Sequence, residues 1–267
     1  MSHQSLNVFA VDVGNTHCHY GLLRGDTILA TGRCATAELN PGKNPFRHWI
    51  EHHANKVDSL YDAAYCSVVP AVNGCIEQAL SELGLTCFHL QSNSCPGLRI
   101  AYPKPQEIGE DRLANALAAD ALYGAPVVVI DMGTAVTFDI VTRRGGYEGG
   151  IIAPGIALMT RYLHEQTALL PQLRAEELVE VPGGIGQSTI DAMRLGCSVG
   201  FSGMLAALLE RVESELARRN ESPVQVISTG GTMAFLSRDW MRRMEFVADL
   251  TLRGLAIAVM RSHDERD

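Results

Sequence analysis

Alternating apolar and polar positions around short turns dominate the first part of the chain. Residues 6–15 (LNVFAVDVGN) predict a strand, and residues 17–34 (HCHYGLLRGDTILATGRC) alternate on either side of Gly25 and Asp26. Alternation with a period of two residues is typical of half-buried strands, and a Gly-Asp pair between them is typical of a hairpin turn. The protein is therefore expected to begin with three antiparallel strands.

Helices and strands alternate after these strands. Helical periodicity is expected over residues 46–57 and 72–84, with a strand over 62–69 between them. Residues 110–125 give the strongest helix prediction, because acidic residues occupy the first turn, alanine and leucine dominate, and Gly124 closes it.

The second half of the chain repeats the plan of the first. Residues 8–23 (VFAVDVGNTHCHYGLL) and 127–142 (VVVIDMGTAVTFDIVT) share an apolar run, an Asp-x-Gly turn, a small hydroxyl residue and an alternating strand. Such a pattern rarely arises twice by chance in one short chain, so we interpret it as a duplication. The alternative is two ordinary hairpins whose turns use Asp and Gly, as turns often do.

Less regular patterns complete the chain. They predict helices over 190–219, a strand over 222–228, a glycine turn over 229–236 and a last helix over 252–260. No low-complexity tract interrupts these elements.

Composition and charge narrow the classes of function. The chain has 267 residues, 46% hydrophobic and 19% charged, with a net charge of −8 and seven cysteines. The negative charge repels phosphate backbones, so nucleic acid is not expected as a partner. No Cys-x-x-Cys pair indicates a disulfide framework or a zinc site. No apolar run approaches the roughly 20 residues that cross a bilayer, and no signal-type start is seen, so we expect a cytoplasmic protein without a membrane partner.

The two Asp-x-Gly turns carry the first candidate chemistry. Gly14 lets the backbone come close to a ligand, and Asn15 and Thr16 offer donors, so the turn can hold a phosphate with its N–H groups. Magnesium prefers one or two carboxylates together with phosphates and water. From the residues alone, Asp12 and Asp131 are both expected to serve magnesium at a phosphate chain.

Two further segments are candidates for binding and proton transfer. Gly230 and Gly231 follow a predicted strand and permit flat contact with a base or ribose, although a plain turn explains them equally well. At the mouth of the helix over 110–125, Asp111 beside Arg112 is a candidate for taking a hydroxyl proton while the arginine binds an anion. The alternative is an acidic helix start with a solvated arginine.

Six motifs together resemble the type III pantothenate kinase family. They are VDVGNT, YPKPQEIGEDRLANALAA, VVVIDMGTAVTFDIV, YEGGIIAPGI, IGQSTIDAM and ISTGG, and the resemblance covers about residues 8–260. The resemblance implies an α/β fold of two duplicated ribonuclease H-like (actin-like ATPase) domains, 1–118 and 119–267, each a mixed five-stranded sheet flanked by helices.

The resemblance also implies an activity and its cofactors. It predicts a homodimeric kinase that uses ATP to convert pantothenate to 4'-phosphopantothenate, the first step of coenzyme A biosynthesis. Mg²⁺ and a monovalent cation, K⁺ or NH₄⁺, are the implied metals. Asp131 would hold the monovalent cation, which revises the magnesium role inferred from the residues, and Asp12 would serve Mg²⁺, directly or through water.

The same resemblance assigns roles residue by residue. Asp111 would be the general base, Thr134 an ATP contact, and Gly230 and Gly231 the adenosine turn. The first phosphate loop would comprise Asp12, Val13, Gly14, Asn15, Thr16, His17, Cys18 and His19. The pantothenate pocket would comprise Tyr102, Gly109, Glu110, Asp111, Arg112 and Thr189.

One segment departs from the family pattern. His17-Cys18-His19 stands where the family more often has small or apolar residues. On a strand His17 and His19 share one face, but a third metal ligand is not evident, so a metal is not expected there. The contacts of these last loop residues stay open.

Rival functions are weaker. Residues 196–200 (GCSVG) match the Gly-x-Ser-x-Gly of serine hydrolases, but a helix rather than a strand is expected before Ser198, and the only later histidine is His263. No Walker A motif indicates a P-loop kinase. A non-catalytic regulator of the same fold is a further alternative, which the acidic charge and Asp111 disfavour.

Overall fold

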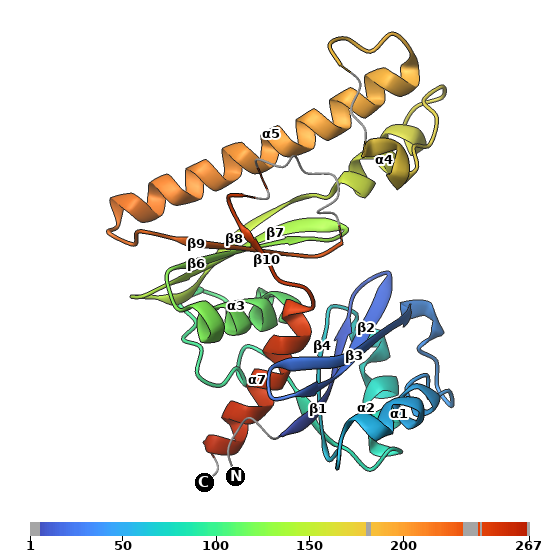
Figure 1. The fold of residues 1–267 in the computed structure, drawn as a ribbon, viewed down its shortest axis with the longest axis vertical. Coiled ribbons are helices and arrows are strands. Elements are labelled where there is room, and N and C mark those ends of the chain that lie inside the picture. Colours follow the sequence, from blue (N-terminus) through green and yellow to red (C-terminus); the bar gives the residue numbers. More distant parts are fainter. Residues whose placement is uncertain (1–5, 180–182, 232–239, 241, 266–267) are drawn as a thin grey trace. The chain divides into compact units, whose positions relative to one another are not determined.

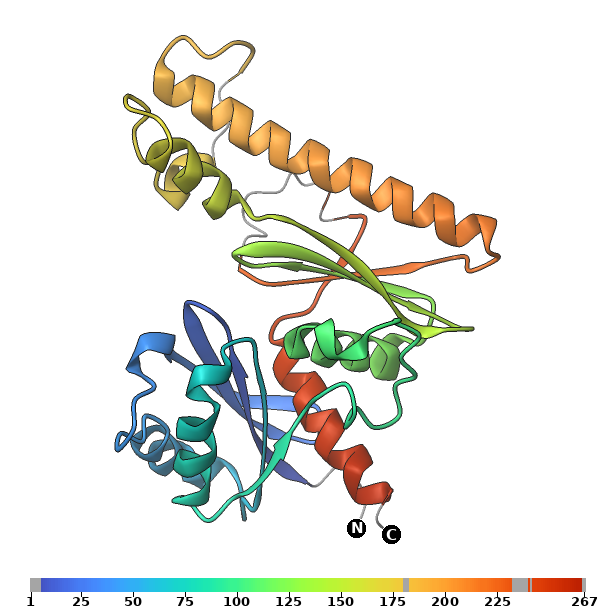
Figure 2. The same cartoon turned by 180° about the vertical axis from the view of Figure 1, so that it is seen from behind.

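A computed structural model describes residues 6–179, 183–231, 240 and 242–265. Contacts group the chain into two compact units, each of which is treated by itself (Figures 1 and 2). The first unit holds Met1–Gly124, Arg144–Gly149 and Asp249–Asp267, and the second holds Ala125–Arg143 and Gly150–Ala248. The division at residue 118 stays a prediction, and the contacts group the last helix with the first unit.

The first unit is built on a five-stranded mixed sheet, in the order β3-β2-β1-β4-β5. The central strand β1 pairs antiparallel with β2 and parallel with β4. Buried apolar residues occupy nearly all of β1, as expected for a strand covered on both faces. The strands are β1 (Asn7–Val13), β2 (His17–Arg24), β3 (Thr27–Ala35), β4 (Asp62–Ser67) and β5 (Thr86–His89).

Helices cover both faces of this sheet. Phe9, Val11 and Val13 of β1 pack into one core with Ile76 and Leu80 of α2. The opposite face carries α7, which contacts β1, β4 and α3. The helices are α1 (Arg47–His53), α2 (Asn73–Ser81), α3 (Glu110–Tyr123) and α7 (Leu250–Asp264).

The contact between α3 and α7 explains why the last helix belongs to this unit. A Cβ at Gly254 would lie 2.0 Å from the carbonyl oxygen of Ala114, so only glycine allows the helices to approach this closely. Beside it, the Thr251 hydroxyl donates to Oδ1 of Asn115 at 2.8 Å, and both side chains are buried.

The second unit repeats the sheet of the first. Its order, β8-β7-β6-β9-β10, corresponds strand by strand to β3-β2-β1-β4-β5, and β6 pairs antiparallel with β7 and parallel with β9. The expected fold class, two duplicated five-stranded mixed sheets flanked by helices, is confirmed. The strands are β6 (Val127–Met132), β7 (Ala135–Thr142), β8 (Gly146–Pro154), β9 (Gln225–Thr229) and β10 (Glu245–Phe246).

The long helix α5 (Thr189–Arg218) packs one face into the second core, and α4 (Ile156–Glu165) packs against it. The buried apolar residues of α5 recur every three or four positions, as one helix face requires: Met193, Cys197, Phe201, Leu205, Leu209, Val212 and Leu216. Short 3₁₀ turns lie at Thr36–Glu38, Ala54–Lys56, Pro70–Val72, Pro105–Glu107 and Ala175–Leu178.

By length and composition alone, α5 passes as a membrane-spanning helix, with a mean hydropathy of 1.5 over its best window. The expectation that no segment approaches that length and apolarity is therefore wrong. The reason is that glycine, serine and alanine interrupt the apolar run between Leu195 and Leu209 without adding charge. The core helix of a soluble protein passes the same test, and α5 packs one face into the second core.

Candidate active site

The first Asp-x-Gly turn joins β1 to β2. The Gly14 amide donates to the His17 carbonyl at 3.0 Å, which closes the turn, while Asn15, Thr16 and His17 are exposed. Thr36, just after β3, holds the turn in place; sequence analysis did not identify it. Its hydroxyl donates to the Gly14 carbonyl at 2.7 Å, and its amide donates to the Thr16 carbonyl at 3.0 Å. Thr36 thus fixes the backbone of the turn while the tip of the turn stays exposed to solvent, as a phosphate-binding turn requires.

Asp12 lies at the end of β1, in register with Cys66 of β4. The Cys66 thiol donates to Oδ1 of Asp12 at 3.4 Å. Burial, and then the negative charges of Asp12, Asp111 and Glu110, raise the pKa of Cys66 well above its ordinary value. Cys66 therefore stays a neutral donor, and its surroundings show that the first turn and the start of α3 lie at the same end of the sheet.

The last residues of the first loop are held within the first unit. Cys18 is buried and lies opposite Cys34 on β3. His19 is half-buried with Nε2 3.5 Å from Oδ1 of Asp249, and burial lowers the pKa of its ring. Among the described residues, no group of three or more His, Cys, Asp or Glu side chains is arranged to hold a metal ion.

Asp111 occupies the first turn of α3. Burial raises its pKa, although the backbone amide and the positive charge of Arg112 partly oppose this shift. The Arg112 amide donates to Oδ1 at 2.8 Å. A Cβ at Gly109 would lie 2.6 Å from the same oxygen, so glycine is needed for the side chain to fold back over the helix start. A carboxylate of raised pKa, fixed at a helix start, is suited to accept a proton.

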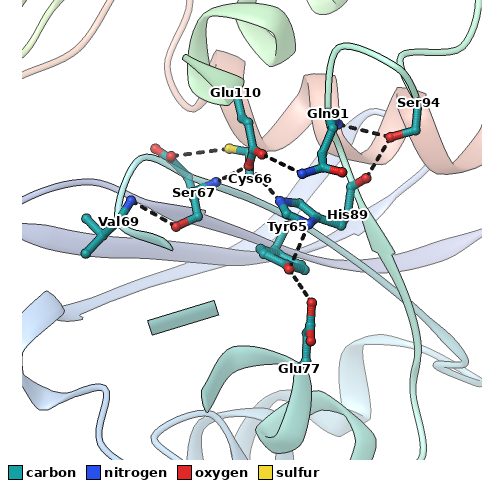
Figure 3. Close-up of polar contacts among 10 residues, drawn as sticks. Tyr65, Cys66, Ser67, Val69, Glu77, His89, Gln91, Ser94 and Glu110 are labelled. Carbon is teal, nitrogen blue, oxygen red and sulfur yellow. Dashed lines mark hydrogen bonds and ion pairs between the residues drawn. The ribbon is translucent and has the colours of Figure 1, made fainter. Parts of the chain in front are cut away.

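Glu110 points to the other side of the helix start. Its Oε2 accepts from the Ser67 amide at 2.7 Å and contacts Nε2 of His89 at 2.8 Å, and its Oε1 accepts from Gln91 at 3.3 Å (Figure 3). Sequence reasoning missed these three partners, because they come from β4, from β5 and from the loop after it. No local motif marks them.

A cavity of about 430 Å³ opens beside this helix start. It is lined by Gln91, Ser92, Asn93, Pro105, Gln106, Ile108 and Glu110. Tyr102 belongs to the same unit, where its ring lies beside Gly149 and 6.4 Å, centroid to centroid, from the ring of Tyr147. The first unit therefore contains Asp12, Tyr102, Gly109, Asp111 and Arg112, and the surroundings of Cys66 place Asp12 at the same end of the sheet as Asp111.

The second Asp-x-Gly turn is one residue shorter than the first. Met132 pairs with Val136, whereas Val13 pairs with Cys18. The Gly133 amide donates to the Ala135 carbonyl at 3.1 Å, and Thr134 is exposed at the tip.

Gly230 packs directly under the second turn. A Cβ there would lie 2.6 Å from the Met132 carbonyl oxygen and 2.8 Å from Oδ1 of Asp131, and its φ is +92°. The second unit thus brings Asp131, Thr134 and Gly230 together. The rest of the expected glycine turn, residues 232–236, lies outside the described residues. Thr189, a proposed pantothenate contact, is exposed at the start of α5. It follows Ser188, whose hydroxyl accepts from the Asp191 amide.

Ser198 does not form a nucleophile elbow. It lies in the middle of α5, is buried, and donates its hydroxyl to the Leu178 carbonyl at 3.2 Å. A nucleophile elbow needs an exposed serine at a strand-to-helix turn, so the hydrolase reading is wrong.

Comparisons with known sequences point to one family. The profile of the family described as "Type III pantothenate kinase" matches residues 8–211. A type III pantothenate kinase of Akkermansia muciniphila is 45% identical over 199 residues, covering 74% of this chain and 78% of that protein. Those of Methylacidiphilum infernorum and Agathobacter rectalis are 36% and 33% identical, covering 92% and 93% of this chain and 86% and 95% of theirs.

Solved structures support the fold. A protein of Campylobacter jejuni described as a Baf family transcriptional activator aligns with a TM-score of 0.58 at 18% identity, covering 96% of this chain and 99% of its own. An activator of 2-hydroxyisocaproyl-CoA dehydratase from Clostridium difficile, with bound ADPNP, aligns with a TM-score of 0.52 at 11% identity, covering 98% and 97%. These identities show the fold alone. With its profile match and its close relatives, the chain belongs to the type III pantothenate kinase family, a family of phosphotransferases.

Proposed function

We propose that this protein transfers the terminal phosphoryl group of ATP to the primary hydroxyl of pantothenate, giving 4'-phosphopantothenate and ADP in the first step of coenzyme A biosynthesis. The observation that carries the proposal is Asp111: a partly buried carboxylate of raised pKa, at the same end of the sheet as an open phosphate-type turn, in a chain of this family.

Asp111 is the proposed general base. The substrate oxygen forms a bond to the terminal phosphorus of ATP, the bond from that phosphorus to the bridging oxygen breaks, and the hydroxyl proton passes to Asp111. Phosphoryl transfer needs mainly positioning and charge neutralisation, so a single carboxylate suffices for the proton. The fixed side chain described above supports this assignment.

The nucleotide is proposed to lie on the Asp-x-Gly turns. Asp12, Val13, Gly14, Asn15, Thr16, His17, Cys18 and His19 are the proposed first phosphate loop, with Thr134, Gly230 and Gly231 as further contacts. The first turn fits a phosphate, because its tip is exposed and its carbonyls at Gly14 and Thr16 are already bonded to Thr36. Bound Mg²⁺ would neutralise charge on the phosphates, and Asp12 is its proposed ligand.

Asp131 is proposed to hold K⁺ or NH₄⁺. Its side chain lies beside Gly230, where that glycine packs against the second turn. Thr134, at the tip of the same turn, is exposed. A carboxylate and nearby carbonyl oxygens are suitable donors for such a cation.

Pantothenate is proposed to bind at the start of α3. Arg112 supplies positive charge for an anion, and the cavity of about 430 Å³ provides room for a small molecule. The proposed contacts are Tyr102, Gly109, Glu110, Asp111, Arg112 and Thr189.

A cytoplasmic homodimer is proposed as the working form, with nucleic acid and membrane excluded as partners. The best apolar window of α5 is only 33% buried, and Val199 of this helix is 57% exposed. A second copy of the chain covering this face would remove the apolar surface from water. Sedimentation of wild type and of Val199→Glu tests this: a monomeric wild type would contradict it.

The activity is tested with purified protein, ATP, Mg²⁺ and K⁺, with pantothenate compared against glycerol and simple sugars. The expected result is 4'-phosphopantothenate formation and ADP release that depend on pantothenate. No product under these conditions would overturn the proposed function and favour the regulatory alternative.

A further inference from the structure

A continuous chain of polar side chains runs through the first unit and ends at Glu110. The Tyr65 hydroxyl donates to Oε1 of Glu77 at 2.6 Å and contacts Nδ1 of His89 at 2.9 Å; Nε2 of His89 contacts Glu110 at 2.8 Å (Figure 3). The Tyr65 and His89 rings are stacked, with centroids 4.1 Å apart. The four residues come from β4, α2, β5 and α3, so the chain joins four elements.

The hydrogen-bonding capacities of these side chains fix the direction of two of the contacts. Burial, and next the hydrogen bond to Glu77, raise the pKa of the Tyr65 phenol well above its ordinary value. The phenol therefore stays protonated and donates its hydrogen bond to Glu77. The Glu110 carboxylate can only accept, so Nε2 of His89 donates to it.

The far end of this chain is the start of the helix that carries Asp111. Glu110 is only 16% exposed and bonds the Ser67 amide, which lies at the end of β4 next to Val13 and the first phosphate turn. Every polar atom of its side chain is therefore engaged by the protein, although Glu110 also lines the cavity.

We propose that Glu110 is a positioning residue: held by His89, Tyr65 and Glu77, it ties the first turn of α3 to the end of β4 and so sets the distance between Asp111 and the phosphate turn. This inference rests on the proposed kinase function and deepens it. It narrows the role of Glu110, which the proposed function groups with the pantothenate contacts, to holding the base.

The test compares Glu110→Gln and Tyr65→Phe with Glu107→Gln, the same change at an exposed residue three positions earlier that is paired with Lys104. Tyr65→Phe keeps the ring stacked on His89 and removes only the hydroxyl. We expect kcat to fall about tenfold or more in both network variants, with the KM for ATP changed less than about twofold, because a misplaced base slows chemistry and leaves nucleotide binding intact. The control should match wild type.

A second readout separates positioning from general loss of structure. Burial raises the pKa of Asp111 most, and the charge of Glu110 adds to it. Glu110→Gln should therefore move the acid limb of the kcat/KM profile to lower pH, whereas Tyr65→Phe, which keeps the charge of Glu110, should leave the limb in place; a loosened fold that exposed Asp111 would move it in both variants. An unshifted limb, or a kcat equal to that of wild type in a folded variant, would overturn the inference.

Nitrogen NMR of the histidine rings tests the network without any activity. The signal assigned through His89→Gln should show Nε2 protonated in wild type, and Tyr65→Phe should change it. A wild-type ring that carries its proton on Nδ1 alone would refute the proposed arrangement. If wild type shows this signature but no kinase activity, the proposed function and the positioning role fail while the network stands; if wild type is active but lacks the signature, only the network fails.

Discussion

The backbone amide of Arg112 lies 2.8 Å from Oδ1 of Asp111, the residue immediately before it. The carboxylate thus folds back onto the helix start instead of extending into solvent, and Gly109 leaves the space that this fold-back needs. The amide, the arginine charge and the helix dipole all favour the charged form, yet burial outweighs them and raises the pKa. Asp111 is therefore held in place and made more basic by the same geometry.

Asp111→Asn should abolish most of the turnover. Asparagine keeps the shape and can still accept from the Arg112 amide, but it cannot take the hydroxyl proton. General-base catalysis contributes about 10²- to 10⁴-fold, so kcat should fall by about 100-fold or more. Titration with ATP should give wild-type affinity. Asp120→Asn, the same change near the other end of α3, should leave kcat unchanged; an active Asp111→Asn would remove Asp111 from the mechanism.

The same substitution should stabilise the protein at neutral pH. The folded-state pKa of Asp111 lies above its value of 3.8 in the unfolded chain. As the pH rises from 3.8 through the folded-state pKa, the unfolded chain releases its proton first, and the folded state loses stability relative to it. Asparagine carries no such penalty, so Asp111→Asn should raise the free energy of unfolding in urea at pH 7 but not at about pH 4. A less stable variant at pH 7 would contradict the burial argument.

The fold was predictable where a local pattern reports burial. β1 and β6 are nearly all buried and read as apolar runs ending in Asp-x-Gly, so the duplication was visible in the sequence. β10 is only Glu245–Phe246, and both residues are exposed, so no pattern could mark it. The grouping of α7 with the first unit depends on the close approach of Gly254 to Ala114, a contact between distant residues that periodicity cannot report.

The residues of the candidate site also fall into those that a local pattern identifies and those that it does not. Asp12 and Asp131 stand at the ends of β1 and β6, next to their turns, and Asp111 stands at a helix start, where residue type and spacing indicate their chemistry. Thr36, in the 3₁₀ turn after β3, and His89, on β5, act through side chains that meet the site from other parts of the first unit, and neither belongs to a motif. Local sequence therefore predicts the groups proposed to contact ligands better than the groups that hold them.

Removing the Asp131 carboxylate should raise the K⁺ requirement. If Asp131 holds the monovalent cation, Asp131→Asn should increase the half-saturating K⁺ concentration at least about tenfold, because a first ligand is lost. Replacing K⁺ by Na⁺ should lower wild-type activity, since the two ions differ in preferred ligand distance. Asp58→Asn, at an exposed loop residue, serves as the control. Equal K⁺ dependence in wild type and Asp131→Asn would assign the cation elsewhere.

The glycines of the second unit should separate folding from nucleotide binding. Gly230→Ala forces an L-residue to φ +92° and brings its Cβ within 2.6 Å of the Met132 carbonyl oxygen, so it should cost about 1–3 kcal/mol of unfolding free energy. Gly133→Ala meets only ordinary contacts, 3.5 Å from the Ala135 carbonyl oxygen, and should cost less than about 1 kcal/mol.

Gly133→Ala, although it should cost little stability, should weaken ATP binding. Gly133→Ala places a methyl group on the turn where the phosphates are proposed to rest, so the KM for ATP should rise even though the fold is intact. Gly84→Ala, which has φ +74° but open space around it, measures the backbone strain alone. Urea unfolding and ATP titration of the three variants check these outcomes. A Gly133→Ala protein with normal stability and normal ATP affinity would show that the phosphates do not lie on the second turn.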